Sequence, residues 1–167
     1  MGGGDKTLMP VAGKPMLAHV LERLRPAHRF IVLSANGDAA RFSAFGLPVV
    51  GDGAYLGAGP LAGILAGLRW AREVGTEALL VAPGDAPCLP HGLAARLEPA
   101  PGYAYAERAH PLVSLLPVSA CGALEAWLEA GRSRAVLAFL EAVGARAVQF
   151  LHEAEFRNVN TPGDLAD

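Results

Sequence analysis

The sequence predicts an α/β domain with a mainly parallel sheet. Apolar runs of strand length alternate along the chain with segments whose apolar residues recur at helical spacing, a pattern typical of strands joined by crossover helices. Of the 167 residues, 52% are hydrophobic and 18% are charged, which excludes a disordered chain and is enough for a sizeable core. No internal repeat, linker or low-complexity tract divides the sequence, so we expect residues 1–167 to form a single domain.

The first half of the chain begins with a helix at Pro15, whose missing N–H costs nothing in a first helical turn. Its apolar residues keep helical spacing as far as Leu24, and Pro26 ends the pattern. The elements expected next are, in order, a buried strand at 30–33, a short helix at 39–45, a strand at 47–50, a glycine-rich loop at 51–60, a helix from about residue 60 and a buried strand at 78–82.

The second half contains shorter elements in the same alternation. We expect a short helix at 90–97, strands at 103–107 and 111–116, helices at 119–130 and 134–143, and a late strand at 145–151. A terminal helix is expected after these, because Thr161 is a good N-cap residue and Pro162 suits the first helical position.

Composition excludes several classes of protein. A formal net charge of -2 argues against a broad basic surface for nucleic acid, whereas a small anionic ligand needs only a local positive pocket. Cys88 and Cys121 are too few for a disulfide framework or a zinc site, and we expect both to be buried thiols in a reducing compartment. No signal-peptide pattern opens the sequence, and the apolar run at 61–70 is too short to span a bilayer. We therefore expect a cytoplasmic protein with no membrane partner.

Polar residues follow three of the expected strands. They are Asn36, Asp52 and Asp85. In open α/β sheets ligands bind beyond the carboxyl ends of the strands, so these residues are the first indication of an enzyme. Asp85 is the best single candidate: it follows a continuous apolar strand, and a hard cation such as Mg²⁺ prefers one or two carboxylates with phosphate oxygens and water. The alternative is a turn aspartate that caps the next helix.

A glycine run with a lysine is the next candidate. Gly2, Gly3 and Gly4 would let backbone N–H groups approach phosphate oxygens, and Lys6 would add a point charge. A flexible terminal tail is the alternative reading. The run does not match the P-loop pattern, because no Gly-Lys-Ser/Thr follows it.

Amide side chains are a third class of candidates. Asn36, with Asp52, could hold the sugar or base of a nucleotide, although each could instead cap a helix or form a turn. Asn158 and Asn160 would lie on one face of an extended segment by the two-residue period, and an amide oxygen can bind Mg²⁺. Asn160 is also placed to cap the terminal helix.

The remaining polar candidates are a histidine and two arginines. The five histidines show no metal-binding spacing, so a transition-metal site is not expected. His110 precedes Pro111 at the start of an apolar strand and could contact a substrate, or could be a surface histidine. Arg132 and Arg134 precede a helix and could meet a phosphate, or could be solvated.

Taken together, these segments resemble one family of enzymes. Residues 1–6, followed by Gly13-Lys14-Pro15-Met16-Leu17, are similar to the end of the nucleotidyltransferase signature Leu-x-Gly-Gly-x-x-x-Arg-Met-Gly-x-x-Asp-Lys. Residues 59–63 resemble the Gly-Pro-Leu-Ala-Gly segment of the molybdenum cofactor guanylyltransferases, and residues 83–90 resemble their Cys-Asp-Thr-Pro block. His110-Pro111 and residues 158–162 fit their later motifs.

The resemblance implies a Rossmann-like, three-layer nucleotidyltransferase fold and a reaction. That reaction is the Mg²⁺-dependent transfer of GMP from GTP to the terminal phosphate of molybdopterin, with release of pyrophosphate. It also implies that Lys6 and the glycines before it contact the GTP phosphates and that Asp85 binds Mg²⁺. Molybdopterin-handling proteins and apo-molybdoenzymes are the implied protein partners.

The same resemblance assigns the other polar residues to two sides of the site. Asn36 and Asp52 would hold the nucleoside. The residues on the molybdopterin or second-metal side would be His110, Arg134, Asn158 and Asn160.

Two features depart from the family pattern. Gly84 and Ala86 replace the usual cysteine and threonine beside the aspartate, which leaves the carboxylate in place. The first strand of the signature and its Leu-x-Gly-Gly turn are absent, and that strand should be central in the sheet. We therefore expect its neighbours to lack hydrogen-bond partners, the chain to be weakly stable and poorly active, and the true start to lie upstream.

Two rival readings remain. One is a related transferase that uses CTP or a sugar phosphate, against which the Gly-Pro-Leu-Ala-Gly segment argues. The other is a catalytically inactive paralogue that binds a nucleotide or a partner molybdoenzyme without transferring anything.

Overall fold

Strands and helices alternate through the computed structural model, which describes residues 6–157. The strands are β1 (Pro10–Val11), β2 (Lys14–Pro15), β3 (Leu33–Ser34), β4 (Val49–Val50), β5 (Ala78–Val81), β6 (Gly102–Tyr105), β7 (Ala109–Pro117) and β8 (Arg146–Gln149). The α-helices are α1 (Met16–Leu24), α2 (Pro60–Glu73), α3 (Leu93–Leu97), α4 (Cys121–Glu129) and α5 (Val136–Ala142). The 3₁₀ turns are η1 (Lys6–Leu8), η2 (Ala39–Phe45), η3 (Gly53–Tyr55), η4 (Val118–Ala120) and η5 (Glu153–Phe156).

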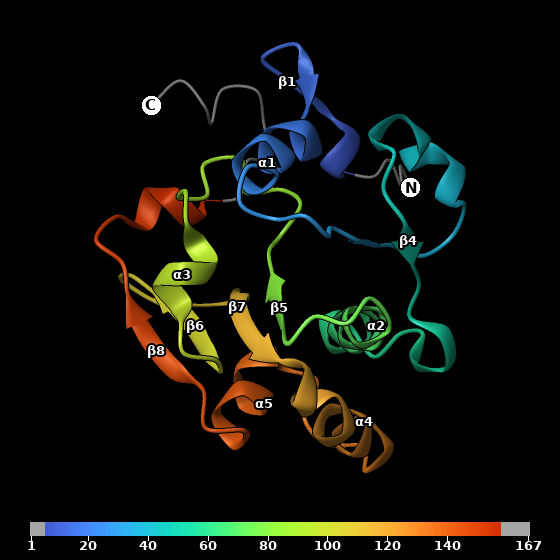
Figure 1. Cartoon of the computed structure of the whole chain (residues 1–167), viewed down its shortest axis with the longest axis vertical. Coiled ribbons are helices and arrows are strands. Elements are labelled where there is room, and N and C mark those ends of the chain that lie inside the picture. The colour runs from blue at the N-terminus through green and yellow to red at the C-terminus, as the bar shows by residue number, and fades with distance from the viewer. Residues whose placement is uncertain (1–5, 158–167) are drawn as a thin grey trace.

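The main sheet has the strand order β5-β7-β6-β8 (Figure 1). β7 runs antiparallel to β5 and to β6, whereas β6 and β8 are parallel. Three of these four strands therefore share one direction, and β7 is the exception. A separate parallel pair is formed by β3 and β4, and β1 and β2 form a small hairpin. The predicted α/β class with a mainly parallel sheet is confirmed.

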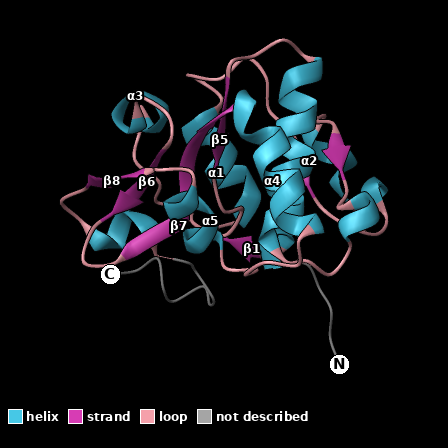
Figure 2. Ribbon diagram, turned by 90° about the horizontal axis from the view of Figure 1, so that it is seen from below, coloured by secondary structure: helices cyan, strands magenta, loops and turns pink. Residues whose placement is uncertain are grey.

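Helices cover both faces of the sheet, which gives three layers (Figures 1 and 2). One core contains Val20 of α1 and Leu93 and Leu97 of α3, and the other contains buried residues of α2, α4 and α5. The strands supply alternate residues to the two cores: Leu80 packs on the α1–α3 side, and Leu79 and Val81 pack on the other side. This alternation is what a strand between two layers requires.

Two glycines allow α2 to lie close to both sheets. A Cβ at Gly63 would overlap the Ser34 hydroxyl oxygen at the end of β3, and a Cβ at Gly67 would lie 3.0 Å from Leu79 Cδ2 on β5. Pro60 occupies the first turn of this helix, as expected from the sequence. α2 therefore packs against the small sheet and the main sheet at once.

No described strand lies between β3 and β5. β3 pairs only with β4, β5 pairs only with β7, and a cavity of about 870 Å³ lies between them. The strand expected at 30–33 is reduced to Leu33–Ser34, and the apolar residues of β5 at 79–81 are only half-buried. Among residues 6–157, neither β3 nor β5 has a paired strand on the side of the cavity.

Other expectations have mixed outcomes. The helix expected from Pro90 begins at Leu93, after a left-handed Gly92. Cys121 is buried as expected, but Cys88 is exposed, so the prediction of two buried thiols is wrong for Cys88. The terminal helix expected after Thr161 lies outside the described residues.

None of the helices between residues 6 and 157 has the length and apolar character needed to cross a membrane.

We predict that Gly102→Ala lowers the free energy of unfolding by about 1–3 kcal/mol, because the added methyl group overpacks a buried site. A Cβ at Gly102 would lie 2.7 Å from the backbone carbonyl oxygen of Leu97, which cannot rotate away. The matched control is Gly122→Ala in α4, where a Cβ meets nothing within 4 Å. Urea unfolding should show the control to be neutral or up to about 1 kcal/mol more stable; equal losses in both variants would contradict the packing argument.

Candidate functional site

Asn36 and Asp52 form a pair at the carboxyl ends of β3 and β4. Asn36 Nδ2 donates to Asp52 Oδ2 at 2.6 Å, and the Asp52 backbone N–H donates to Asn36 Oδ1 at 2.9 Å. The two residues lie on neighbouring parallel strands, whose ends meet at one edge of the sheet. The structure thus brings two of the candidate residues into direct contact.

The surrounding loops hold this pair in place. Arg41 Nη2 donates to the Asn36 carbonyl oxygen at 2.7 Å, and its guanidinium lies over the Phe42 ring. A side chain at Gly51 would come within 3.4 Å of Asn36 Oδ1, so glycine leaves room for the amide. Asp52 occupies the N-cap position of η3, and its backbone carbonyl oxygen accepts from the Tyr55 N–H at 3.0 Å, but its carboxylate makes no capping hydrogen bond and accepts from Asn36 instead.

Asp85 lies in the turn that follows β5, where its side chain is half-buried. Within residues 6–157 no hydrogen bond or ion pair engages its carboxylate. The next helix begins at Leu93 with Gly92 in the capping position, so Asp85 does not cap it. The Asp85 carboxylate thus follows the end of β5 and neither caps a helix nor makes a hydrogen bond among the described residues.

Gly84 allows the turn that contains Asp85 to pack closely against η1. A Cβ at Gly84 would lie 3.0 Å from Thr7 Cγ2 and 3.7 Å from Leu17 Cδ1. The glycine that replaces the usual cysteine therefore lets η1 approach this turn. Lys6 precedes Thr7 and Asp85 follows Gly84, so both residues lie next to this contact in the sequence. Lys6 is exposed.

These loops open on one cavity. Its rim is formed by residues from all three strand-end loops and from η1: Thr7, Asn36, Arg41, Asp52, Gly59 and Gly84. No group of three or more His, Cys, Asp or Glu residues in the described ranges is arranged to hold a metal. The site thus offers separate carboxylates and amides around an open space, and not a closed metal cage.

Arg134 and Arg132 have different surroundings. Arg134 Nη1 donates to the Gly57 carbonyl oxygen at 2.8 Å, which ties it to the glycine-rich loop. Arg132 lies over the Trp127 ring. The structure therefore associates only Arg134 with a loop that leads to the site.

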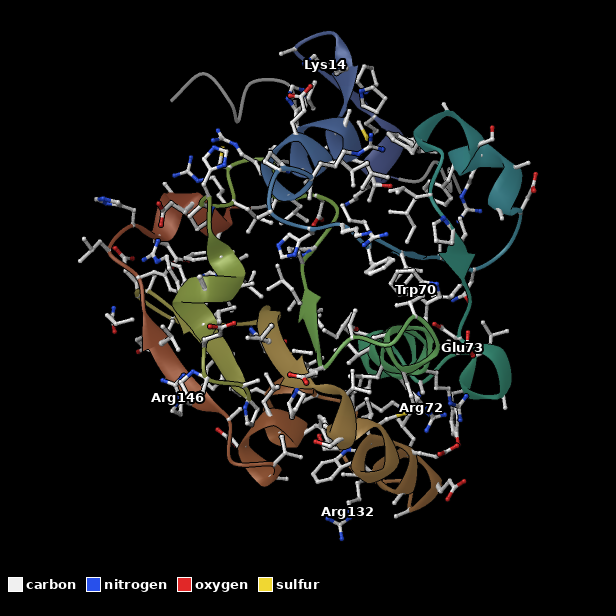
Figure 3. The ribbon with its side chains drawn as sticks, viewed as in Figure 1. Lys14, Trp70, Arg72, Glu73, Arg132 and Arg146 are labelled. Atoms are coloured by element: carbon white, nitrogen blue, oxygen red, sulfur yellow. The ribbon has the colours of Figure 1, made fainter. Side chains whose placement is uncertain are left out.

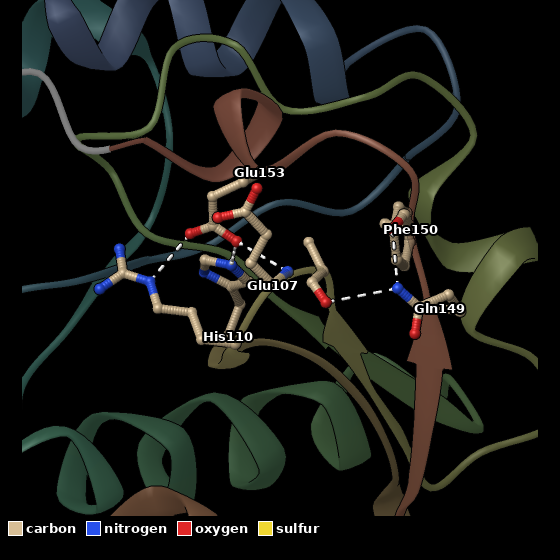
Figure 4. Close-up of polar contacts among 7 residues, drawn as sticks. Glu107, His110, Gln149, Phe150 and Glu153 are labelled. Carbon is tan, nitrogen blue, oxygen red and sulfur yellow. Dashed lines mark hydrogen bonds and ion pairs between the residues drawn. The ribbon is translucent and has the colours of Figure 1, made fainter.

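His110 lies in a different cluster, at the start of β7 (Figure 4). Its Nε2–H donates to Glu153 Oε2 at 2.9 Å, and its ring stacks on Phe156 with centroids 4.5 Å apart. Only 9% of its side chain is exposed, so the surface-histidine alternative is wrong. Arg108 Nε donates to the other carboxylate oxygen of Glu153 at 2.8 Å.

Glu153 was not identified from the sequence. Its one local signal is an acidic side chain in the first turn of η5, and a hydrogen bond across 43 positions has no sequence pattern. A hollow of about 440 Å³ opens beside it, lined by residues that include Glu107, Arg108 and Arg157. Glu153 thus lines this hollow and also holds His110 through a hydrogen bond.

The ionisation of Glu153 follows from these contacts. Burial alone would raise the pKa of its carboxyl, but hydrogen bonds from His110 and Arg108 outweigh burial and hold the pKa below its ordinary value. A carboxyl with a lowered pKa in the folded state contributes stability above its unfolded pKa. That contribution is lost as the pH falls through the folded pKa.

Gly2, Gly3, Gly4, Asn158 and Asn160 lie outside the described residues. Their roles stay predictions.

Known proteins resemble this chain over almost its whole length. The family model of the MobA-like NTP transferase domain matches residues 1–146. A molybdenum cofactor guanylyltransferase of Acidiphilium cryptum is 46% identical over 99% of this chain and 85% of that protein. One from Cereibacter sphaeroides is also 46% identical, over 99% of this chain and 87% of that protein.

A solved structure shares the fold as well. Molybdopterin-guanine dinucleotide biosynthesis protein A from Archaeoglobus fulgidus matches with a TM-score of 0.74 at 26% identity, over 98% of this chain and 88% of that chain. The family match over residues 1–146 includes every loop that forms the rim of the cavity.

We predict that Glu153→Gln lowers the free energy of unfolding by about 1 kcal/mol at pH 7, because the uncharged amide holds His110 and Arg108 less strongly. The stability difference from the wild type should shrink as the pH falls below about 4.5, because the Glu153 carboxyl then protonates first in the unfolded state. The difference is lost once the pH falls through the lower pKa of the folded state. Urea unfolding at pH 7 and pH 3 measures both values. The matched control is Glu155→Gln in the same turn, and a difference that widens in acid would contradict the assignment.

Proposed function

The chain belongs to the family of MobA-like nucleotidyltransferases that includes the molybdenum cofactor guanylyltransferases, and from this premise we propose that it guanylylates molybdopterin. GTP would be the donor, and the terminal phosphate of molybdopterin the acceptor. The observation that carries the proposal is the convergence of Asn36, Asp52 and the Asp85 turn on one cavity rim beside η1. That edge is where an α/β sheet binds its ligands.

The proposed reaction is one substitution at phosphorus. An oxygen of the molybdopterin phosphate forms a bond to the α-phosphorus of GTP, and the bond from that phosphorus to the bridging oxygen of the β-phosphate breaks. Pyrophosphate leaves, and GMP stays joined to the cofactor. Such a reaction needs positioning and charge neutralisation more than covalent help from the protein.

Asp85 is the residue proposed to hold Mg²⁺. Its half-buried carboxylate engages no partner in the described part of the chain, so its oxygens are available to a cation. Mg²⁺ is commonly bound by one or two carboxylates with phosphate oxygens and water, so a single protein carboxylate can serve this role. A bound Mg²⁺ would neutralise charge on the phosphates of GTP. Asn160 is proposed as a further ligand.

Lys6 and the pair of Asn36 and Asp52 are proposed to bind GTP. Lys6 is exposed on η1, close to the Asp85 turn, where an ammonium group can meet a phosphate. Asn36 keeps one amide N–H, and Asp52 keeps carboxylate capacity, after their mutual hydrogen bonds are counted. These groups would fix the nucleoside. Gly2, Gly3 and Gly4 would cradle the phosphates with their backbone N–H groups.

The acceptor side of the site rests on fewer contacts. We propose that His110, Arg134 and Asn158 act on the molybdopterin side. His110 is held by Glu153 next to an open hollow, and Arg134 is anchored to the glycine-rich loop. Molybdopterin-handling proteins and apo-molybdoenzymes are the proposed protein partners, and the cytoplasm is the proposed location.

We predict that Asp85→Asn lowers the rate of pyrophosphate release from GTP and molybdopterin by at least about 100-fold, because the amide cannot neutralise a cation. The melting temperature should not change, since the carboxylate supports no described contact. The matched control is Asp38→Asn, another aspartate in a strand-end loop, whose Oδ1 accepts from the Ala40 N–H at 2.9 Å.

Asparagine also caps well, so this control should keep both stability and rate. Full activity of Asp85→Asn would remove Asp85 from the proposed mechanism. Isothermal titration of both variants with GTP and Mg²⁺ would distinguish a loss of binding from a loss of the chemical step.

A further inference from the structure

His110 and the pair of residues at the ends of β3 and β4 lie on opposite sides of the strand that leads to Asp85. β3 and β4 face β5 across the cavity, whereas β7 adjoins β5 on its other side (Figure 1). Val81, the last residue of β5, pairs with Ser114, so residues 109–113 of β7 extend beyond β5 at the edge where the chain turns at Asp85. This stretch therefore flanks the proposed metal site on the side opposite the proposed nucleoside site.

His110 also occupies the face of the sheet on which the Asp85 turn packs. It pairs with Ala104 across β6 and β7, and residues directly opposite each other on two strands share a face. Ala104 belongs to the buried cluster that also contains Phe156, on which the histidine ring stacks. Ala86, the residue after Asp85, is buried in the same cluster. The histidine ring and the Asp85 turn thus rest on one core.

The turn η5 brings Glu153 to the same edge of the sheet. β5, β6 and β8 share one direction, so their carboxyl ends lie at one edge. β8 begins at Arg146 and ends at Gln149, and η5 follows it at the end opposite Arg146 (Figure 3). This turn carries both Glu153 and Phe156, so it supplies the hydrogen bond and the ring contact that hold His110.

Three donors fix the carboxylate of Glu153 (Figure 4). Arg108 Nε donates to Oε1 at 2.8 Å, and the Glu107 backbone N–H donates to Oε2 at 3.3 Å. His110 Nε2–H donates to Oε2 at 2.9 Å. An ionised carboxylate only accepts hydrogen bonds, so its partner nitrogen must carry the proton. The histidine ring is therefore held in one orientation with Nε2 protonated.

Nδ1 is the ring nitrogen of His110 that stays available to a ligand. No described residue makes a hydrogen bond to it. Ser114 Oγ is the one fully buried side-chain polar atom without a partner in the described part of the chain, so the unpartnered Nδ1 is reached by solvent. Nδ1 accepts a hydrogen bond from a P–OH group when the ring is neutral, and Nδ1–H donates to an anionic phosphate oxygen when the ring is charged.

We propose that Glu153 is a positioning residue of the acceptor site: it accepts the Nε2–H of His110 and so directs Nδ1 to a phosphate oxygen of the acceptor. The inference rests on the proposed function, in which the acceptor ends in a phosphate. A phosphate of GTP is the other source of the same chemistry, but His110 lies on the side of the Asp85 turn away from the proposed nucleoside site. Glu153 acts through His110, since its own negative charge would repel the phosphate.

A double-mutant cycle tests whether Glu153 acts through His110. Glu153→Gln should raise the KM for molybdopterin about tenfold, because an amide donates as well as accepts and no longer fixes the ring. The kcat and the KM for GTP should stay within about twofold of the wild type. In a His110→Gln background, Glu153→Gln should change the KM for molybdopterin by less than about twofold.

The matched control for this cycle is Glu155→Gln. Glu155 lies in the same turn, and its side chain makes no hydrogen bond or ion pair in the described ranges, so this variant should match the wild type. An equal rise in KM from Glu153→Gln in both backgrounds would show a role that bypasses His110. A rise in the KM for GTP would place the contact on the nucleotide. Either result would overturn the inference.

Inorganic phosphate tests the contact without turnover. In protein labelled with ¹⁵N at histidine, phosphate should move the Nδ1 resonance of His110, which is assigned by its absence in His110→Gln. Glu155→Gln should keep this shift, and Glu153→Gln should lose it at the same phosphate concentration. No shift in the wild type, or an equal shift in Glu153→Gln, would overturn the inference.

The two readouts separate this inference from the proposed function. A wild-type protein that shows the Glu153-dependent phosphate shift but releases no pyrophosphate from GTP would contradict the proposed reaction, while the role of Glu153 would stand. Pyrophosphate release by the wild type, with no effect of Glu153→Gln on the KM for molybdopterin, would support the reaction and overturn the role of Glu153.

Discussion

The packing of α2 against both β3 and β5 is the contact on which the arrangement of the site depends, because those two strands share no hydrogen bond. Gly63 and Gly67 let the helix reach Ser34 on one strand and Leu79 on the other. Through this helix the loop of Asn36 and Asp52 keeps its position relative to the turn of Asp85. Gly63, the last residue of the Gly-Pro-Leu-Ala-Gly segment, and Gly67 one helical turn later thus align the two halves of the site.

Sequence patterns predicted the elements well where local signals were strong. They predicted them poorly where contacts between residues far apart in the sequence determine the structure. The helix after Pro15, the helix after Pro60 and the strand at 78–81 follow from local spacing and capping chemistry. The strand expected at 30–33 is shorter because strand length depends on a neighbour that local spacing does not include. The exposure of Cys88 likewise depends on the turn that places it, not on its type.

The site shows the same division between local and distant information. The strand-end rule brought Asn36, Asp52 and Gly84, the neighbour of Asp85, to one cavity. It could not show that Asn36 and Asp52 bond to each other while Asp85 engages no described partner. Nor could it show that Glu153 holds His110. Asn36 and Asp52 thus have a fixed geometry before a ligand binds, whereas the Asp85 carboxylate stays available, as its proposed role in binding Mg²⁺ requires.

The central claim is that this rim binds GTP and supports transfer of its nucleotide to molybdopterin. The most direct measurement is the rate of pyrophosphate release with molybdopterin and Mg²⁺, using GTP and CTP in parallel with the same protein. The account predicts a kcat/KM for GTP at least about tenfold above that for CTP, a difference of roughly 1.4 kcal/mol in transition-state binding. Equal use of the two nucleotides, or a preference for CTP, would contradict it.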